Sequence, residues 1–336
     1  MAIRVAINGF GRIGRAFVRQ TWDNPDIELV AINDLGSAEN LAYLLRYDTV
    51  YGKAPFPVLA GEGVLTINEK QVRFLSEKDP AALPWGEIGV DVVVEATGIF
   101  TNYEKANAHI TAGARRVVIT GPVKEEHPLG ATILMGLDES KLATCPITSN
   151  ASCTTNAASP VIAILDEELG IEKAILSTTH AYTASQAIVD GPSKKDMKEG
   201  RAAAQNIVPT STGAAIAVTK AYPSLAGKFD GISLRVPVPA GSIADITFLA
   251  KRATSVEEVN GILRSAASDA RWAGLFAVTD EELVSSDIVG ERTASIADLG
   301  MTRVVDGNLV KVLAWYDNEA GYTATLVRHV LQAAAA

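Results

Sequence analysis

The chain is poor in cysteine, with 2 in 336 residues, and it has only 4 histidines. Two cysteines cannot build the disulfide framework of a small secreted protein, so a reducing compartment such as the cytoplasm is favoured. No run of about 18 apolar residues is present, which excludes an obvious membrane-spanning helix. The N-terminal stretch MAIRVAINGFGRIGR has no long apolar segment and predicts no signal peptide.

Clustered positive charge is also missing. The net charge is −9, and no basic run indicates nucleic acid as the main partner. Apart from the terminal AAAA there is no low-complexity segment, and there is no internal repeat. We therefore expect a protein without a nucleic-acid partner, a membrane partner or a metal. Its length and its hydrophobic content of 48% suit two globular domains.

The first 150 residues alternate short apolar strands with helical segments. The strands are expected at 3–8, 27–34, 90–98 and 114–121, and a helix is expected from residue 12. The third and fourth strands are almost continuous runs of valine and isoleucine, which is typical of parallel strands covered by helices on both faces. This order predicts a doubly wound (Rossmann) α/β domain over residues 1–150.

A different pattern follows from Ile171. In GISLRVPV, Ile232 and Leu234 alternate with Ser233 and Arg235, which indicates a strand with one apolar and one polar face. We expect helices on the apolar face and exposed chemistry on the polar face. A hairpin turn is expected at 306–308 and a last helix over 319–336. The second domain, 151–318, should be α+β with a mixed or antiparallel sheet.

The glycine loop NGFGRIGR has the spacing G-x-G-x-x-G at Gly9, Gly11 and Gly14. It follows an expected strand and opens an expected helix, and Asp34 ends the next strand. In this setting the glycines allow a tight turn, a close approach to a pyrophosphate and close helix packing. The Asp34 carboxylate suits the ribose hydroxyls of NAD and would repel the 2′-phosphate of NADP. The alternative is a glycine turn that only packs.

Cys153, in SNASCTTNAAS, stands at the expected start of a helix. Free N–H groups at a helix start stabilise a thiolate and can lower a cysteine pKa to about 3.5–7.5. The alternative, an inert packed cysteine, fits its small polar neighbours poorly. Cys145 precedes a proline in apolar sequence and is expected to be buried.

A thiolate nucleophile needs a base. We expect His109 and His127 at the surface, and His329 lies in the last helix. His180 ends the expected strand that follows the cysteine helix, so the two side chains can meet at one end of the sheet. Spacing alone does not decide whether they do.

The motifs INGFGRIGR, SNASCTTN, DGPSKKD, GRAAAQNIVP, STGAA, SLRVPVP and WYDNEAGY together resemble those of phosphorylating glyceraldehyde-3-phosphate dehydrogenases. They occur in the family's order over essentially the whole chain. The resemblance implies an NAD-binding domain, then a catalytic domain, with the last helix packing back on the first. It also implies a cytoplasmic homotetramer, with the segment Gln186–Arg201 at a subunit interface.

In such enzymes the thiolate at the Cys153 position attacks the aldehyde of glyceraldehyde 3-phosphate, and the imidazole at the His180 position takes the proton. Hydride passes to the nicotinamide, and inorganic phosphate releases 1,3-bisphosphoglycerate from the thioester. The glycine-loop and strand-end residues that would hold NAD are Asn8, Gly9, Phe10, Gly11, Arg12, Ile13, Gly14, Asp34, Leu35, Thr97, Gly98, Thr120, Asn318 and Tyr322. By position, Thr183 and Arg235 resemble the substrate-phosphate site. The inorganic-phosphate site would be formed by Ser152, Thr154, Arg201, Thr212 and Gly213.

Some positions depart from the family's usual pattern: Asp138, Ala157, Ala240, Gly241 and Ala320. Leu35 and Pro192 resemble the NAD-preferring forms. Two rival functions remain. Erythrose-4-phosphate dehydrogenases share the cysteine motif, although HAYTASQ and DGPSKKDMKEGRAAAQ look like the glyceraldehyde 3-phosphate enzymes. A non-catalytic NAD-binding scaffold is disfavoured because Cys153, His180 and the arginines are all present.

Overall fold

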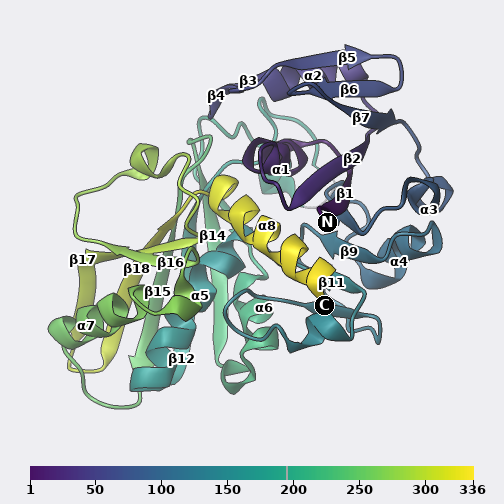
Figure 1. Cartoon of the computed structure of the whole chain (residues 1–336). Helices are drawn as coiled ribbons and strands as arrows, with labels where there is room; N and C mark the ends of the chain where they lie inside the picture. The colour runs from purple at the N-terminus through teal and green to yellow at the C-terminus, as the bar shows by residue number, and fades with distance from the viewer. Residues whose placement is uncertain (194–195) are drawn as a thin grey trace. The chain divides into compact units, whose positions relative to one another are not determined.

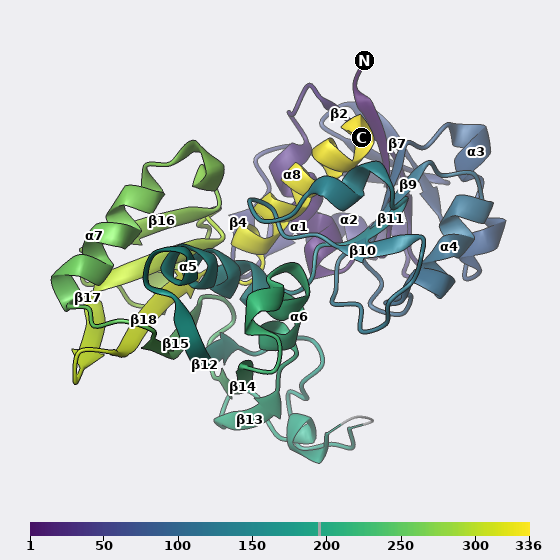
Figure 2. The ribbon, with the colours of Figure 1, turned by 90° about the horizontal axis from the view of Figure 1, so that it is seen from below.

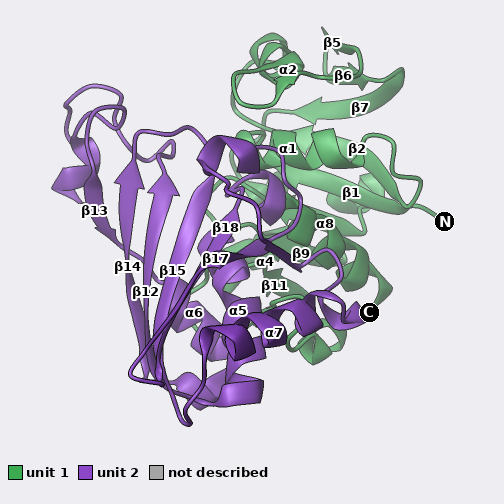
Figure 3. Cartoon of the chain, turned by 90° about the vertical axis from the view of Figure 1, so that its left-hand side faces the viewer, with its two compact units in different colours: residues 1–151, 323–336 green, residues 152–322 purple. Residues whose placement is uncertain are grey.

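The computed structural model describes residues 1–193 and 196–336 (Figure 1), so Lys194 and Lys195 of the DGPSKKD motif lie outside the described residues. These residues divide into two units (Figure 3). The first contains 1–151 and 323–336, and the second contains 152–322.

The first unit alternates strands and helices along the chain. Its elements are β1 (Ile3–Asn8), α1 (Arg12–Thr21), β2 (Ile27–Asn33), α2 (Ala38–Arg46), β3 (Tyr47–Asp48), β4 (Gly52–Lys53), β5 (Val58–Gly61), β6 (Val64–Ile67), β7 (Lys70–Leu75), α3 (Trp85–Ile88), β8 (Val92–Glu95), α4 (Tyr103–Thr111), β9 (Arg116–Ile119), β10 (Gly130–Thr132) and β11 (Ile147–Ser149). The main sheet has the order β10-β11-β9-β8-β1-β2-β7-β6-β5. Its strands from β10 to β7 run parallel, and β5–β6–β7 form an antiparallel extension.

The centre of this sheet is buried on both faces. Val92, Val93 and Val94 of β8 have no exposed surface, and neither do Val117 and Val118 of β9. Side chains of successive strand residues point to opposite faces, so full burial of consecutive valines requires cover on both sides. The predicted doubly wound fold is confirmed, and the carboxyl ends of its parallel strands meet at one edge.

The last helix, α8 (Ala320–Ala335), contributes its residues from Thr323 onward to the first unit. His329 is buried there, with Nδ1 3.1 Å from Asn150 Oδ1 and Nε2 2.8 Å from Thr148 Oγ1. The Asn150 amide nitrogen donates to Thr325, so its oxygen faces the imidazole and accepts from Nδ1–H. The neutral ring therefore satisfies both neighbours at once.

The second unit holds a mixed sheet with the order β13-β14-β12-β15-β18-β17-β16. Its elements are α5 (Cys153–Leu169), β12 (Ile171–Ala181), β13 (Val208–Ser211), α6 (Ala214–Ala221), β14 (Phe229–Val236), β15 (Ser242–Ala250), α7 (Val256–Ala267), β16 (Phe276–Thr279), β17 (Ser295–Val305) and β18 (Leu309–Tyr316). The predicted hairpin is confirmed, because β17 and β18 pair antiparallel around residues 306–308. Helices α5, α6 and α7 pack on the strands of this sheet (Figure 2).

The faces of this sheet differ from the expectation for GISLRVPV. Thr178 of β12 pairs with Ser233 of β14, and Ser233 is only 3% exposed. Ile175 and Ile232, on the opposite face, are 58% and 50% exposed. The prediction of exposed chemistry on the polar face was wrong, because the polar side chains lie on the buried, helix-covered face with α5. In the single chain it is apolar side chains that reach the surface.

No helix in the described ranges 1–193 and 196–336 is long and apolar enough to cross a membrane.

Burial lowers the pKa of His329 to about 3, well below its ordinary value of 6.5. The unfolded chain therefore takes up a proton below pH 6.5, whereas the folded protein does not. The stability linked to this residue is complete above about pH 6.5 and decreases as the pH falls towards 3, by up to about 1.4 kcal/mol per pH unit. We expect His329→Gln to flatten the fall of Tm between pH 6.5 and pH 4. An unchanged slope in calorimetry would contradict the role assigned to this ring.

Candidate active site

The glycine loop makes a tight turn between β1 and α1. Gly9 has φ +96°, and a Cβ there would lie 2.6 Å from the backbone of Ala96 and Thr97. A Cβ on Gly14 would lie 2.4 Å from the Gly9 carbonyl oxygen. A Cβ on Gly11 would meet no atom within 4 Å. Gly9 and Gly14 thus allow close backbone packing, while Gly11 leaves open space before the first N–H groups of α1, where a pyrophosphate fits.

Asp34 directly follows β2 and is half-buried. Its Oδ2 accepts from the Phe10 N–H at 2.7 Å, and its Oδ1 accepts from the Gly36 N–H at 2.8 Å. These bonds orient the carboxylate and leave each oxygen with a lone pair for a ribose hydroxyl.

Asp34 lines a cavity of about 360 Å³ at the carboxyl ends of β1, β2 and β8. The lining residues that the sequence predicted as cofactor contacts are Asn8, Gly9, Gly11, Asp34, Leu35 and Thr97. Those that it missed are Asn33, Glu77, Lys78, Ala96, Ile99 and Phe100. Glu77 and Lys78 follow β7, the parallel neighbour of β2, so the recognition of β7 as a strand would have placed them at this edge.

Other predicted cofactor contacts make bonds within the protein. Phe10 is fully buried, the Arg12 guanidinium pairs with Asp48, and the Thr120 hydroxyl donates to the Glu95 carbonyl oxygen at 3.0 Å. Ile13 lies in the first turn of α1, and Gly98 follows β8 with φ +70°. Their contacts with a cofactor stay predictions.

In the second unit, the start of α5 meets the end of β12. The Ser152 hydroxyl caps α5 by accepting from the Thr155 N–H at 3.1 Å, which places Cys153 in the first turn. Cys153 Sγ lies 3.3 Å from His180 Nε2. The pairing that spacing left undecided is therefore present.

Arg235 of β14 stands beside His180 in the parallel register of β12 and β14. One guanidinium nitrogen is 2.6 Å from His180 Nδ1 and 3.2 Å from the Ala181 carbonyl oxygen. Its Nε is buried without a hydrogen-bond partner among the described residues. A buried guanidinium with an unused donor is suited to an anionic ligand.

Burial and the Arg235 charge lower the pKa of His180 to about 3. Burial also raises the pKa of the Cys153 thiol, despite the opposing effects of Arg235 and of hydrogen bonds from Thr154. The expected depression of the cysteine pKa by the helix start was therefore wrong: desolvation outweighs it. The pair rests as neutral thiol and neutral imidazole. The Ala181 carbonyl oxygen, which can only accept, lies 2.6 Å from His180 Nδ1, so Nδ1 carries the ring proton and Nε2 is left to take the thiol proton during attack.

Thr154 also belongs to a buried chain of hydroxyl groups. Its Oγ1 lies 2.8 Å from the Tyr316 hydroxyl, which lies 2.8 Å from Thr178 Oγ1. Thr178 donates to the Ile243 carbonyl oxygen at 3.2 Å. This chain fixes the first turn of α5 against β12 and β18.

Asn318 is tied to the end of β12 through one serine. Ser242 Oγ accepts from the Ala181 N–H at 3.1 Å and donates to Asn318 Oδ1 at 3.1 Å. Asn318 and Tyr322 are both buried. The Asn318 amide nitrogen therefore has a fixed direction, as a residue that holds a carboxamide requires.

Four other predicted phosphate contacts occupy loops. Thr183 Oγ1 lies 3.1 Å from Ser185 Oγ, and Arg201 Nε donates to Asp190 at 2.9 Å. Thr212 and Gly213 precede α6, and a Cβ on Gly213 would meet no atom within 4 Å. Within the described part of the chain, no hydrogen bond joins these residues to Cys153.

Two expectations on side-chain burial have different outcomes. Cys145 is buried at 7% exposure, as expected. His109 is 0% exposed, so its predicted surface position was wrong. Tyr103, Ala106 and His109 occupy the buried face of α4 at intervals of three residues, and this helical period is the signal that would have found it.

One departure from the family pattern has a structural reason. Gly241 has φ +86°, and a Cβ there would lie 2.3 Å from the Ser285 carbonyl oxygen. Any side chain at position 241 would collide with this backbone, so the path of the chain at Ser285 requires a glycine here.

Comparison with known proteins places both units in one family. Residues 3–103 match the family model for the glyceraldehyde 3-phosphate dehydrogenase NAD binding domain, and residues 152–318 match that for the C-terminal domain. Proteins named glyceraldehyde-3-phosphate dehydrogenase from Streptomyces coelicolor and Mycobacterium avium are 47% identical, with 97% of each chain covered. A cytosolic one from Leishmania mexicana is 44% identical, with 99% of each chain covered.

The two thiols should differ sharply towards iodoacetamide at neutral pH. Cys153 is half-buried beside a base, whereas Cys145 is buried without one. We expect Cys153 to be alkylated much faster, with parallel loss of activity, and His180→Asn to slow this alkylation. Peptide mapping by mass spectrometry gives both rates. Equal labelling of the two cysteines would contradict the assignment.

Proposed function

The chain belongs to the glyceraldehyde-3-phosphate dehydrogenase family, a family of NAD-dependent oxidoreductases, and we propose that Cys153 and His180 are its catalytic residues. The reaction is the oxidation of glyceraldehyde 3-phosphate with NAD and inorganic phosphate to 1,3-bisphosphoglycerate. The observation that carries the proposal is the 3.3 Å contact between Cys153 Sγ and His180 Nε2. Residues 1–150 with 319–336 act as the NAD-binding domain, and 151–318 as the catalytic domain.

The chemistry follows from the neutral pair. Cys153 Sγ bonds to the aldehyde carbon while His180 Nε2 takes the thiol proton, and His180 then gives this proton to the former carbonyl oxygen, which leaves a thiohemiacetal and a neutral imidazole. NAD, when bound, supplies a hydride acceptor. Loss of hydride from that carbon and of the hydroxyl proton to the base leaves a thioester on Cys153. Phosphate oxygen then attacks the thioester, the carbon–sulfur bond breaks, and the acyl phosphate leaves.

Arg235 and Thr183 bind the phosphate of the substrate in this proposal. The buried, unpartnered Nε of Arg235 supports this role, because a phosphate oxygen would satisfy it. Inorganic phosphate binds near Ser152, Thr154, Arg201, Thr212 and Gly213. The open space at Gly213, before the first turn of α6, supports that site.

NAD is held by the glycine turn and by the residues of the cavity beside Asp34. The open position at Gly11 and the oriented Asp34 carboxylate fit a pyrophosphate and a ribose. Asn318 holds the nicotinamide carboxamide, with Tyr322 close to it.

The function is tested by NADH absorbance with glyceraldehyde 3-phosphate, NAD and phosphate. We expect turnover that requires all three, and we expect His180→Asn to slow it by about 10²–10⁴-fold, the range for loss of general base help. NAD affinity, measured by calorimetry, should stay the same in that variant. Near-normal turnover of His180→Asn would assign the proton transfer to another group. Faster turnover of erythrose 4-phosphate would favour the rival dehydrogenase.

Asp34 sets the preference for NAD over NADP. At about 4 Å, a 2′-phosphate and this carboxylate would repel by about 4 kcal/mol at an effective dielectric constant near 20. Since about 1.4 kcal/mol is a factor of ten, we expect a preference of at least tenfold. Asp34→Gly should raise kcat/KM with NADP and lower it with NAD. Equal kcat/KM for both cofactors in the parent protein would show that Asp34 does not discriminate.

We further propose a cytoplasmic homotetramer. In the segment 186–201, Ile188, Val189 and Met197 are among the most exposed apolar side chains, and Ile175 and Ile232 are exposed on the sheet. Contiguous exposed apolar surface is typical of an interface. Analytical ultracentrifugation should give a tetramer, and Ile232→Asp should weaken it. A fully active monomer would contradict the assembly.

A further inference from the structure

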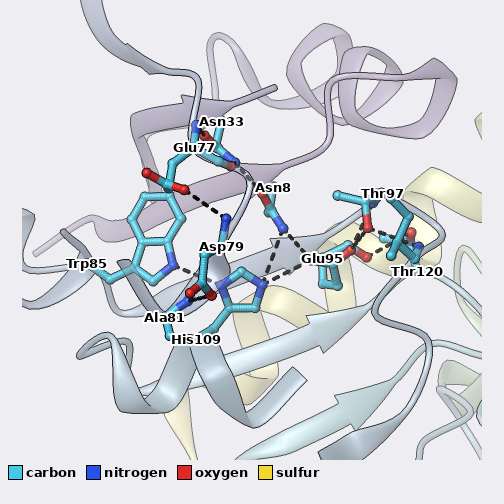
Figure 4. A network of polar contacts seen from close by, with 11 residues as sticks. Asn8, Asn33, Glu77, Asp79, Ala81, Trp85, Glu95, Thr97, His109 and Thr120 are labelled. Carbon is cyan, nitrogen blue, oxygen red and sulfur yellow. Dashed lines mark hydrogen bonds and ion pairs between the residues drawn. The ribbon is translucent and has the colours of Figure 1, made fainter. Parts of the chain in front are cut away.

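A buried polar network (Figure 4) shares Asn8, Asn33 and Thr97 with the lining of the cavity beside Asp34. Glu95 is the last residue of β8, and His109 belongs to α4. Both side chains are almost completely buried, and neither lines the cavity. The catalytic mechanism uses neither of them.

The proton positions on His109 follow from its partners. Trp85 Nε1 can only donate, and it lies 2.9 Å from His109 Nδ1. Nδ1 therefore carries no proton, and Nε2–H donates to Glu95 Oε2 at 2.9 Å. His109 is a neutral donor with a defined tautomer.

Glu95 is surrounded by donors. Its Oε2 also accepts from Asn8 Nδ2 at 2.6 Å, and the Asn8 amide is oriented because its oxygen accepts from Asn33 at 2.7 Å. Its Oε1 accepts from the Thr97 N–H at 2.9 Å and from the Thr97 hydroxyl. That hydroxyl accepts from the Ile99 N–H at 3.0 Å, so its own proton points to Glu95. All four donors are satisfied only by a carboxylate, because both of its oxygens accept. The NH₂ group of a carboxamide at this position would face one of these donors, and no hydrogen bond could form there.

Each oxygen of the Glu95 carboxylate is connected by hydrogen bonds to a different wall of the cavity. Oε1 orders the turn of Thr97 and Ile99. Oε2 accepts from Asn8, and the side-chain oxygen of Asn8 accepts from Asn33. Asn33 in turn accepts from the Glu77 N–H at 2.8 Å and donates to the Glu77 carbonyl oxygen at 2.9 Å. Asn8, Asn33, Glu77, Thr97 and Ile99 all line the cavity.

We propose that Glu95, oriented by His109, is a positioning residue that preorganises both walls of the site for the adenosine half of NAD. This rests on the proposed NAD-binding role of the cavity. A preorganised wall does not have to be ordered when the ligand binds, so affinity is gained without a direct contact. Loss of the network should therefore weaken cofactor binding and leave the chemical step in place.

The first test is Glu95→Gln, which keeps size and removes the acceptor-only character. By calorimetry we expect the Kd for NAD and for ADP-ribose to rise by about tenfold or more, which corresponds to loss of at least one buried charged hydrogen bond. In kinetics the KM for NAD should rise in parallel. The kcat at saturating NAD and the KM for glyceraldehyde 3-phosphate should stay within about twofold. A folded variant with unchanged Kd for both ligands would overturn the proposal.

A matched pair at His109 keeps the test decisive if Glu95→Gln does not fold. His109→Gln retains a donor towards Glu95, whereas His109→Leu removes it. We expect a smaller rise in the Kd for NAD with glutamine than with leucine. Equal Kd values in the parent and both variants, or a fall in kcat without a change in Kd, would overturn the positioning role. Binding is measured without catalysis, so tight NAD binding without turnover would count against the proposed function alone.

Discussion

The contact between Cys153 and His180 depends on where two elements stop. The Ser152 cap begins α5 at the cysteine, and β12 runs until the histidine has reached the same end of the sheet. The hydroxyl chain from Thr154 to Thr178 fixes one element against the other. Arg235 arrives beside them because β14 is the parallel neighbour of β12. Nucleophile, base and guanidinium are thus positioned by one helix start and two adjacent strands.

In the first unit, too, the candidate site lies where elements end, here at the carboxyl ends of the parallel strands. The backbone there approaches so closely that Gly9 and Gly14 admit no side chain, and Gly11 leaves space for a ligand. Behind this surface the Glu95 carboxylate collects donors from several segments. The two buried sites differ in their partners: in one unit four hydrogen-bond donors surround the Glu95 side chain, and in the other burial holds thiol and imidazole neutral.

Much of this architecture could be predicted from the sequence, because local patterns determine it. Continuous valine runs indicate doubly covered strands, and the glycine spacing followed by Asp34 predicts the dinucleotide turn. The sequence does not show which face of a strand becomes buried when both faces carry short side chains. Ser233 and Arg235 do share one face, as predicted, but the expectation that this polar face is exposed was wrong, since α5 covers it. The cysteine pKa was misjudged for a related reason: desolvation depends on tertiary packing, whereas a helix start is local.

The central claim is that substrate becomes covalently attached to Cys153, with His180 as the base. A single turnover without phosphate, followed by rapid mixing and intact-mass spectrometry, tests this most directly. The account predicts a burst of about one NADH per active site, an acyl adduct confined to Cys153, and release of the adduct when phosphate is added. In His180→Asn the same adduct should form slowly. NADH formation without an adduct, or an adduct on another residue, would contradict the account.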